Sequence, residues 1–119
     1  MSDRQLTLDA DPAAALATLL EVSRERPVVV FKKSPTCPIS HRAEWQFKNW
    51  LKVLPATSPI RTVLIDVIAE RPLARGLTAA LDVKHESPQA LWFEGGALRW
   101  HGSHDALTQD RFETLATER

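Results

Sequence analysis

The chain is 119 residues long, of which 44% are hydrophobic and 25% are charged. This length and composition are typical of one globular domain that buries a single hydrophobic core. The 15 basic and 15 acidic side chains cancel, and no basic stripe with interleaved aromatic residues appears, so the composition argues against nucleic-acid binding. No apolar run is long enough to cross a bilayer.

The chain contains one cysteine, Cys37, which therefore has no partner for an internal disulfide bond. The first residues have neither the basic segment nor the apolar run of a secretory signal peptide. A free thiol without a signal peptide favours the cytoplasm, where thiols stay reduced. We therefore expect a cytoplasmic protein that is monomeric and does not associate with membranes.

Proline and glycine residues divide the chain into alternating helical and strand-like segments. Asp11, which is followed by proline, is a suitable N-cap for a helix that runs to about Arg24. The segment 27–31 is a short β-branched apolar run, which predicts a buried strand. From Pro38, apolar residues at three- and four-residue intervals predict a second helix that Pro55 ends.

The second half of the chain begins with the same alternation. Residues 61–68 predict a second buried strand, and Pro72 is expected to begin a third helix. Residues 90–101 contain two strand-like runs separated by two glycines, which is the pattern of a β-hairpin. Thr108 is a candidate N-cap for the last helix.

The predicted order of elements is therefore α-β-α-β-α-β-β-α. Helices between the early strands imply parallel crossovers, whereas the late hairpin must be antiparallel. We expect an α/β fold with a mixed four-stranded sheet and helices on both faces, which is the thioredoxin-like arrangement. Residues 1–119 are expected to form this single domain, with 1–10 as a loosely ordered N-terminal segment.

Cys37 lies at the predicted junction of the first strand with the second helix. Thr36 or Cys37 would be the N-cap and Pro38 the first helical residue, so the thiol would lie against unpaired backbone N–H groups and the positive end of the helix dipole. Both favour the thiolate, which is the nucleophile in disulfide exchange. Four nearby residues could add positive potential: Lys32, Lys33, His41 and Arg42. The alternative is an inert buried cysteine, but these more often lie within a strand or an apolar stripe.

Two further positions bear on the kind of redox chemistry. Ser40 stands where a dithiol oxidoreductase has its second cysteine, and a hydroxyl cannot attack a disulfide, so an external thiol would have to resolve the mixed disulfide. Pro88 precedes the hairpin, where a thioredoxin-like sheet has a cis-proline beside the reactive cysteine. The backbone of Ser87 would then be free to pair with an extended substrate. A simple strand-edge proline is the alternative.

The histidines and one tryptophan allow further interpretations. Of the four histidines only His101 and His104 have plausible ligand spacing, so the sequence does not predict a metal site. His85 is of interest because its loop should approach the cysteine. Trp45 lies off the main apolar stripe of its helix and is expected to face solvent, where it could contact a client peptide.

Three segments resemble the YtxJ-type monothiol bacilliredoxins. They are Phe-Lys-Lys-Ser-Pro-Thr-Cys-Pro-Ile-Ser at 31–40, Val-Lys-His-Glu-Ser-Pro-Gln at 83–89 and Trp-His-Gly-Ser-His at 100–104. The resemblance implies a thioredoxin-like fold and a place in the bacillithiol redox system of certain bacteria. It implies no permanently bound cofactor, with bacillithiol as the low-molecular-weight thiol co-substrate. The implied partners are S-bacillithiolated client proteins, from which bacillithiol would be removed.

Carried over by motif, the resemblance makes Cys37 the nucleophile of a monothiol thiol–disulfide oxidoreductase. The residues expected to shape the site or to bind substrate are Thr36, Pro38, Ser40, His85, Ser87 and Pro88. Two alternatives remain open. One is a glutathione-linked monothiol redoxin, although no Cys-Gly-Phe-Ser-type motif is present. The other is a non-catalytic adaptor that uses a thioredoxin-like fold to bind proteins.

Overall fold

The computed structural model describes residues 4–118, which contain four α-helices and four strands. The helices are α1 (Pro12–Ser23), α2 (Pro38–Val53), α3 (Arg71–Ala80) and α4 (Gln109–Thr117). The strands are β1 (Val28–Lys33), β2 (Arg61–Asp66), β3 (Gln89–Glu94) and β4 (Ala97–Ser103). A short 3₁₀ turn, His104–Ala106, connects β4 to α4.

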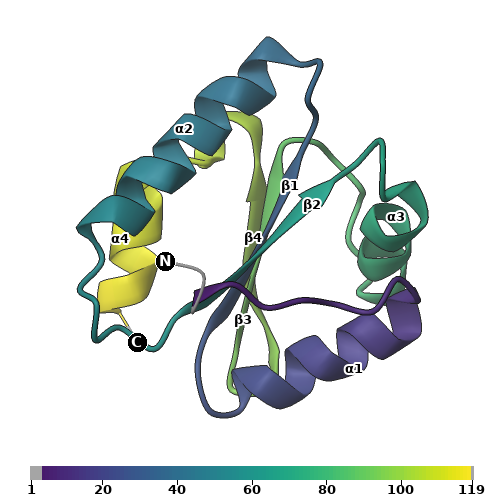
Figure 1. Cartoon of the computed structure of the whole chain (residues 1–119), viewed down its shortest axis with the longest axis horizontal. Helices are drawn as coiled ribbons and strands as arrows, with labels where there is room; N and C mark the ends of the chain where they lie inside the picture. Colours follow the sequence, from purple (N-terminus) through teal and green to yellow (C-terminus); the bar gives the residue numbers. More distant parts are fainter. Residues whose placement is uncertain (1–3, 119) are drawn as a thin grey trace.

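The strands form one mixed four-stranded sheet, as predicted, and their order in it is β2-β1-β3-β4. β1 is parallel to β2 and antiparallel to β3, and β3 is antiparallel to β4. Consequently the carboxyl ends of β1, β2 and β4 and the amino end of β3 lie together, uppermost in Figure 1. We call this end of the sheet, where these strand ends meet, the upper edge. Helices α2 and α3 both begin there, because each follows a strand that ends there.

The two faces of the sheet carry separate hydrophobic clusters, and helices cover both (Figure 1). Side chains alternate between the faces along a strand. Val28 and Val30 therefore pack with α1 and α3, whereas Val29 and Phe31 pack with α2 and α4. The same alternation places Lys32 on the α1/α3 face. That face thus ends, at the upper edge, in a lysine.

The aromatic residues concentrate on the α2/α4 face. Phe47 stacks on Phe31 with ring centroids 4.8 Å apart, and Trp50 stacks on Phe112 at 5.2 Å. These rings pack the second half of α2 against the sheet and α4, and large aromatic side chains bury much apolar area. The packing fixes the position of the amino end of α2, where Cys37 lies.

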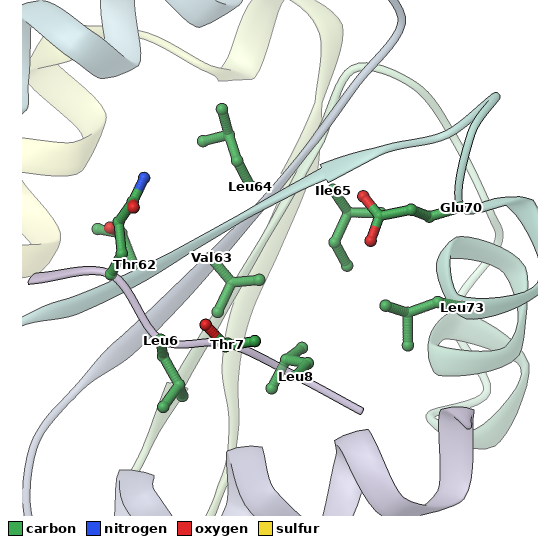
Figure 2. Close-up of a pocket in the computed structure, with 10 residues that line it drawn as sticks. Leu6, Thr7, Leu8, Thr62, Val63, Leu64, Ile65, Glu70 and Leu73 are labelled. Carbon is green, nitrogen blue, oxygen red and sulfur yellow. The ribbon is translucent and has the colours of Figure 1, made fainter. Parts of the chain in front are cut away.

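The N-terminal segment lies along the free edge of β2. The Leu6 N–H donates to the Thr62 carbonyl at 2.8 Å, and the Arg4 guanidinium donates to the Ile60 carbonyl at 3.0 Å. Of the segment 1–10 that the sequence predicts to be loosely ordered, residues 4–6 make these bonds and residues 1–3 lie outside the described part of the chain. Figure 2 shows the pocket of about 230 Å³ between this segment, β2 and the start of α3.

Two strand ends differ from the sequence prediction. β1 continues two residues beyond the predicted segment, because Lys32 finds buried hydrogen-bond partners and the strand need not end at the first charged residue. β2 ends at Asp66, two residues early. The Asp66 carboxylate accepts the backbone N–H groups of Ile68 and Ala69 at 2.9 and 3.0 Å, which turns the chain away from the sheet.

Candidate active site

Cys37 is the N-cap residue of α2. Its backbone is extended, with φ −107° and ψ 119°, and Pro38 is the first residue of the helix. The Cys37 side chain makes no capping hydrogen bond, although Asp11 and Thr108 cap α1 and α4 in the usual way. Cys37 is partly exposed. Cys37 therefore lies beside the unpaired backbone N–H groups of the first turn, and its sulfur accepts no hydrogen bond from them.

The loop before Cys37 is held by side chains of the first turns of α2. Ser40 is fully buried, and its Oγ accepts a hydrogen bond from the Ser34 N–H at 2.8 Å. His41 donates through Nε2 to the Pro35 carbonyl at 2.9 Å. Ser40 thus supports the loop, rather than bonding a carbonyl of the helix cap as its place in a first turn suggests. The ring of His41 is likewise engaged with the loop backbone.

The two lysines near Cys37 in sequence, Lys32 and Lys33, interact with other side chains. Lys33 and Lys48 both pair with Glu44, at 3.6 and 2.9 Å. Partial burial raises the pKa of Glu44, but the hydrogen bonds and charges of Lys48 and Lys33 outweigh this and lower the pKa overall. Lys32 lies in the sheet with its side chain fully buried. Of the four predicted cations, Arg42 is exposed and makes no side-chain bond within residues 4–118.

The segment 81–88 leads from α3 to the upper edge of the sheet, where Pro88 is buried and its peptide bond with Ser87 is cis. The Pro88 carbonyl accepts the His104 N–H at 3.2 Å, and the Glu86 carboxylate accepts the Ser103 hydroxyl. Both bonds join the segment to the end of β4. The Ser87 hydroxyl is buried and has no hydrogen-bond partner in the described part of the chain.

The buried amine of Lys32 holds the same segment from the opposite side. Its Nζ donates to Gln89 Oε1 at 2.6 Å and to His85 Nδ1 at 2.7 Å, and Gln89 Nε2 donates to the Lys84 carbonyl at 2.9 Å. Lys32 and Gln89 are cross-strand neighbours in the β1–β3 register, which brings them onto one face. The lysine therefore ties the strand that leads to Cys37 to both sides of Pro88.

Burial sets the ionisation of this cluster. It lowers the pKa of Lys32 to about 8, with a further lowering by Arg75 and a partial opposing effect of Glu86. Burial also lowers the pKa of His85, as do the charges of Lys32, Arg75 and Arg71. His85 is consequently neutral at pH 7. Because a lysine ammonium can only donate, His85 Nδ1 is the acceptor and its proton is on Nε2.

The sequence reasoning named Ser40, His85 and Pro88 but missed the buried role of Lys32. The β1–β3 register pairs Lys32 with Gln89, and no pattern in the sequence gives this register. No group of three or more His, Cys, Asp or Glu side chains within residues 4–118 could hold a metal ion. Nor is any helix in that range long and apolar enough to cross a membrane.

The sheet order, the flanking helices and a cysteine at the amino end of α2 define a thioredoxin-fold protein. Solved structures agree. One that has a thioredoxin fold and is proposed to be an oxidoreductase superposes with a TM-score of 0.72 at 27% identity, over 98% of this chain and 96% of its own. Thioredoxin O2 of Arabidopsis thaliana gives 0.68 at 16% identity, over 99% and 96%. Fasciola hepatica thioredoxin gives 0.66 at 17%, over 97% of each chain.

Sequence comparison narrows the class to a family. The family model for the monothiol bacilliredoxin BrxC matches residues 10–112, and the chain belongs to this family. The family and the fold together make the protein a thiol–disulfide oxidoreductase.

Proposed function

We propose that this protein removes bacillithiol from S-bacillithiolated client proteins, with Cys37 as the nucleophile. The observation that carries the proposal is the state of Cys37, which occupies the N-cap position of α2, is partly exposed and forms no capping bond. A thiolate at this position is favoured by the helix dipole and the free N–H groups. Membership of the bacilliredoxin family supports bacillithiol as the thiol.

The exchange takes place in two steps. The Cys37 thiolate attacks the bacillithiol sulfur of the client mixed disulfide, so that a bond forms between these two sulfur atoms. The bond between bacillithiol and the client breaks, and the client sulfur leaves with the electron pair and is protonated by solvent. In the second step the thiolate of a low-molecular-weight thiol attacks the bacillithiol sulfur on Cys37. This releases the Cys37 thiolate and forms a small-molecule disulfide.

The external thiol is needed because Ser40 occupies the place of a resolving cysteine. A hydroxyl cannot displace the bacillithiol sulfur, and Ser40 Oγ is buried and bonded to the Ser34 N–H. The reaction therefore stops at the Cys37 mixed disulfide until a second thiol arrives. Such a cycle needs a supply of reduced thiol, and for this reason we place the activity in the cytosol.

The test is intact-mass detection of the Cys37 adduct. The reduced protein is mixed with oxidised bacillithiol and, separately, with oxidised glutathione, and an S-bacillithiolated client is tested for release of its free thiol. We expect the bacillithiol adduct and client release with the native protein, and neither with the Cys37→Ser variant. A faster reaction with glutathione would overturn the bacillithiol assignment alone. The absence of any adduct and of client release would leave the adaptor function and end the redox proposal.

A further inference from the structure

A cavity of about 510 Å³ lies at the end of the sheet opposite the upper edge. Its lining comes mainly from residues 51–61, which lead from the last turn of α2 into the start of β2, and Arg4 and Arg26 complete it. Both β1 and β2 begin at this end of the sheet, as Figure 1 shows. Because α2 runs for 16 residues, or about 24 Å, between Cys37 and this region, the cavity is separate from the thiol site.

Four of the residues that line the cavity are cationic: Arg4, Arg26, Lys52 and Arg61. We call it the basic cavity. No acidic residue is among the lining residues that the structure describes. The carbonyls at the carboxyl end of α2 add only about half a negative charge, which is less than the four positive charges. A bound anion would therefore relieve the repulsion between these cations.

Hydrogen bonds to the backbone hold two of the cations in place. Arg4 Nη1 donates to the carbonyls of Ser58 and Ile60 at 3.2 and 3.0 Å. Arg61 donates through Nε to the Arg4 carbonyl at 3.3 Å and through Nη2 to the Gln5 carbonyl at 2.9 Å. The two arginines are thus neighbours, and the partners of their side chains carry no formal charge. A guanidinium group has five N–H donors, so Arg61 keeps donors for a ligand.

The other two cations of the basic cavity have no partner. Arg26 and Lys52 are exposed, and within residues 4–118 neither side chain makes a hydrogen bond or an ion pair. A lysine in the last turn of a helix is favoured by the helix dipole, which accounts for Lys52 without a ligand. The dipole does not account for three arginines in the same lining. The cavity therefore combines two fixed cations with two that are free to close on an anion.

The lining defines the chemistry of a ligand. The cationic side chains only donate hydrogen bonds, so the ligand must present several acceptor oxygens and more than one negative charge. A phosphate group carries between one and two negative charges at pH 7 and fits the donor fork of a guanidinium group, whereas a carboxylate carries a single charge. The rest of the lining includes the apolar residues Leu51, Leu54, Pro59 and Ile60. These suit an organic group, and the volume is in the range of small-molecule sites.

We propose that the basic cavity binds a small organic phosphate. Its phosphate oxygens accept hydrogen bonds from Arg26, Lys52 and Arg61, and its organic group packs against Leu51 and Leu54. The site is distinct from the proposed exchange reaction, because it lies at the opposite end of α2 from Cys37.

The first test uses ADP, pyrophosphate and adenosine as probes. Each is titrated into the native, reduced protein by calorimetry without added metal ions, and the backbone amides are followed by NMR. We expect saturable binding of ADP, weaker binding of pyrophosphate and no binding of adenosine. The amide signals of residues 56–61 should shift with ADP, and those of residues 34–41 should not.

Three results of this test would overturn the proposal. The first is the absence of saturable ADP binding, and the second is a set of shifts confined to the loop around Cys37. The third is adenosine binding as tight as that of ADP, since the phosphates would then contribute nothing. Pyrophosphate binding as tight as that of ADP would remove the organic group from the assignment.

The second test removes the two cations that have no partner. In Arg26→Gln/Lys52→Gln we expect the Kd for ADP to rise about tenfold, because two charged donors to the phosphate are lost. The fold should be unaffected, since both side chains are exposed and make no bond in the described part of the chain. The matched control is Arg42→Gln/Arg111→Gln, which removes two exposed arginines outside the cavity lining.

The control variant should bind ADP within about twofold of the native affinity, because distant exposed charges are screened by salt. Equal weakening in both double variants would show an effect of net charge alone and would contradict the site. Native affinity in Arg26→Gln/Lys52→Gln would contradict it as well.

A third comparison separates this site from the proposed function. Cys37→Ser should bind ADP with native affinity, and Arg26→Gln/Lys52→Gln should form the Cys37 adduct at the native rate. Saturable ADP binding by a protein that forms no bacillithiol adduct would support the basic cavity and end only the exchange proposal. Adduct formation without ADP binding would do the reverse.

Discussion

Ser40 Oγ accepts the backbone N–H of Ser34 at 2.8 Å, and this bond closes the loop that carries Cys37. The residue in the place of a second thiol is thus a structural part of the active-site loop. Because Ser40 is fully buried, the Ser34 N–H would lose its partner if the hydroxyl were removed. The monothiol character of the site and the geometry of its loop therefore depend on the same side chain.

The first prediction concerns this bond. Ser40→Ala should lower the free energy of unfolding by about 1–2 kcal/mol, because a backbone donor loses its acceptor and a small buried void replaces the oxygen. Urea-induced unfolding, followed by tryptophan fluorescence, measures the change. Thr57→Ala, which truncates an exposed hydroxyl residue outside any helix or strand, should change stability by less than about 0.5 kcal/mol. Equal stability of Ser40→Ala and native protein would contradict the role given to this bond.

The second prediction concerns the reactivity of Cys37. Iodoacetamide at pH 7 should alkylate the native protein about tenfold faster than the urea-unfolded chain, because the start of α2 favours the thiolate only in the folded state. The rates are measured by mass spectrometry of quenched samples. The unfolded chain is an internal control with the same sequence and the same single thiol. A native rate equal to or below the unfolded rate would count against a catalytic Cys37.

Much of the fold could be predicted because local signals agreed with the final packing. Prolines at the starts of α1 and α2 and the paired glycines of the hairpin mark these boundaries within a residue or two. The helical periodicity of α1 was less informative. The sequence predicts an apolar stripe that begins at Ala14 and includes Leu19. Leu19 is buried as expected, but Ala15 is buried in place of Ala14, because consecutive alanines do not indicate which one faces the core.

The site could be predicted only in part. The local sequence limits the N-cap of α2 to Thr36 or Cys37, since proline is favoured at the first helical position, and the structure assigns it to Cys37. The Lys32 cluster could not be predicted in this way. It joins residues 53 and 57 positions apart, and sequence periodicity carries no information on such contacts. A lysine that follows an apolar run predicts the exposed end of a strand, because a buried lysine is rare without hydrogen-bond partners and the sequence does not show them.

The third prediction concerns the pH dependence of stability. Burial, reinforced by Arg75 and partly opposed by Glu86, lowers the pKa of Lys32 from 10.5 to about 8. The unfolded chain therefore binds more protons than the native protein between these values, and the free energy of unfolding should rise with pH across this window. The rise due to Lys32 is at most about 3 kcal/mol.

Lys32→Met provides the comparison, because it fills similar space without a titrating group. Unfolding in urea at pH 7.5 and pH 10 should show that the native protein gains stability relative to the variant as the pH rises. Other groups that titrate in this range contribute to both proteins and cancel in the difference. A constant difference between the two proteins would mean that the folded-state pKa of Lys32 is not lowered.

The last prediction concerns the tautomer of His85. Because Lys32 Nζ donates to Nδ1 at 2.7 Å, the neutral ring should carry its proton on Nε2. In ¹⁵N NMR at pH 7, Nε2 should give a protonated and Nδ1 an unprotonated nitrogen signal. Lys32→Met should weaken this preference and raise the pKa of His85 toward its ordinary value, since one of the charges that lower it is removed.

His41 is the matched control, because its Nε2 bonds the Pro35 carbonyl and makes no contact with Lys32. A protonated Nδ1 in the native protein, or a His85 spectrum unchanged by Lys32→Met, would show that the buried lysine does not orient this ring.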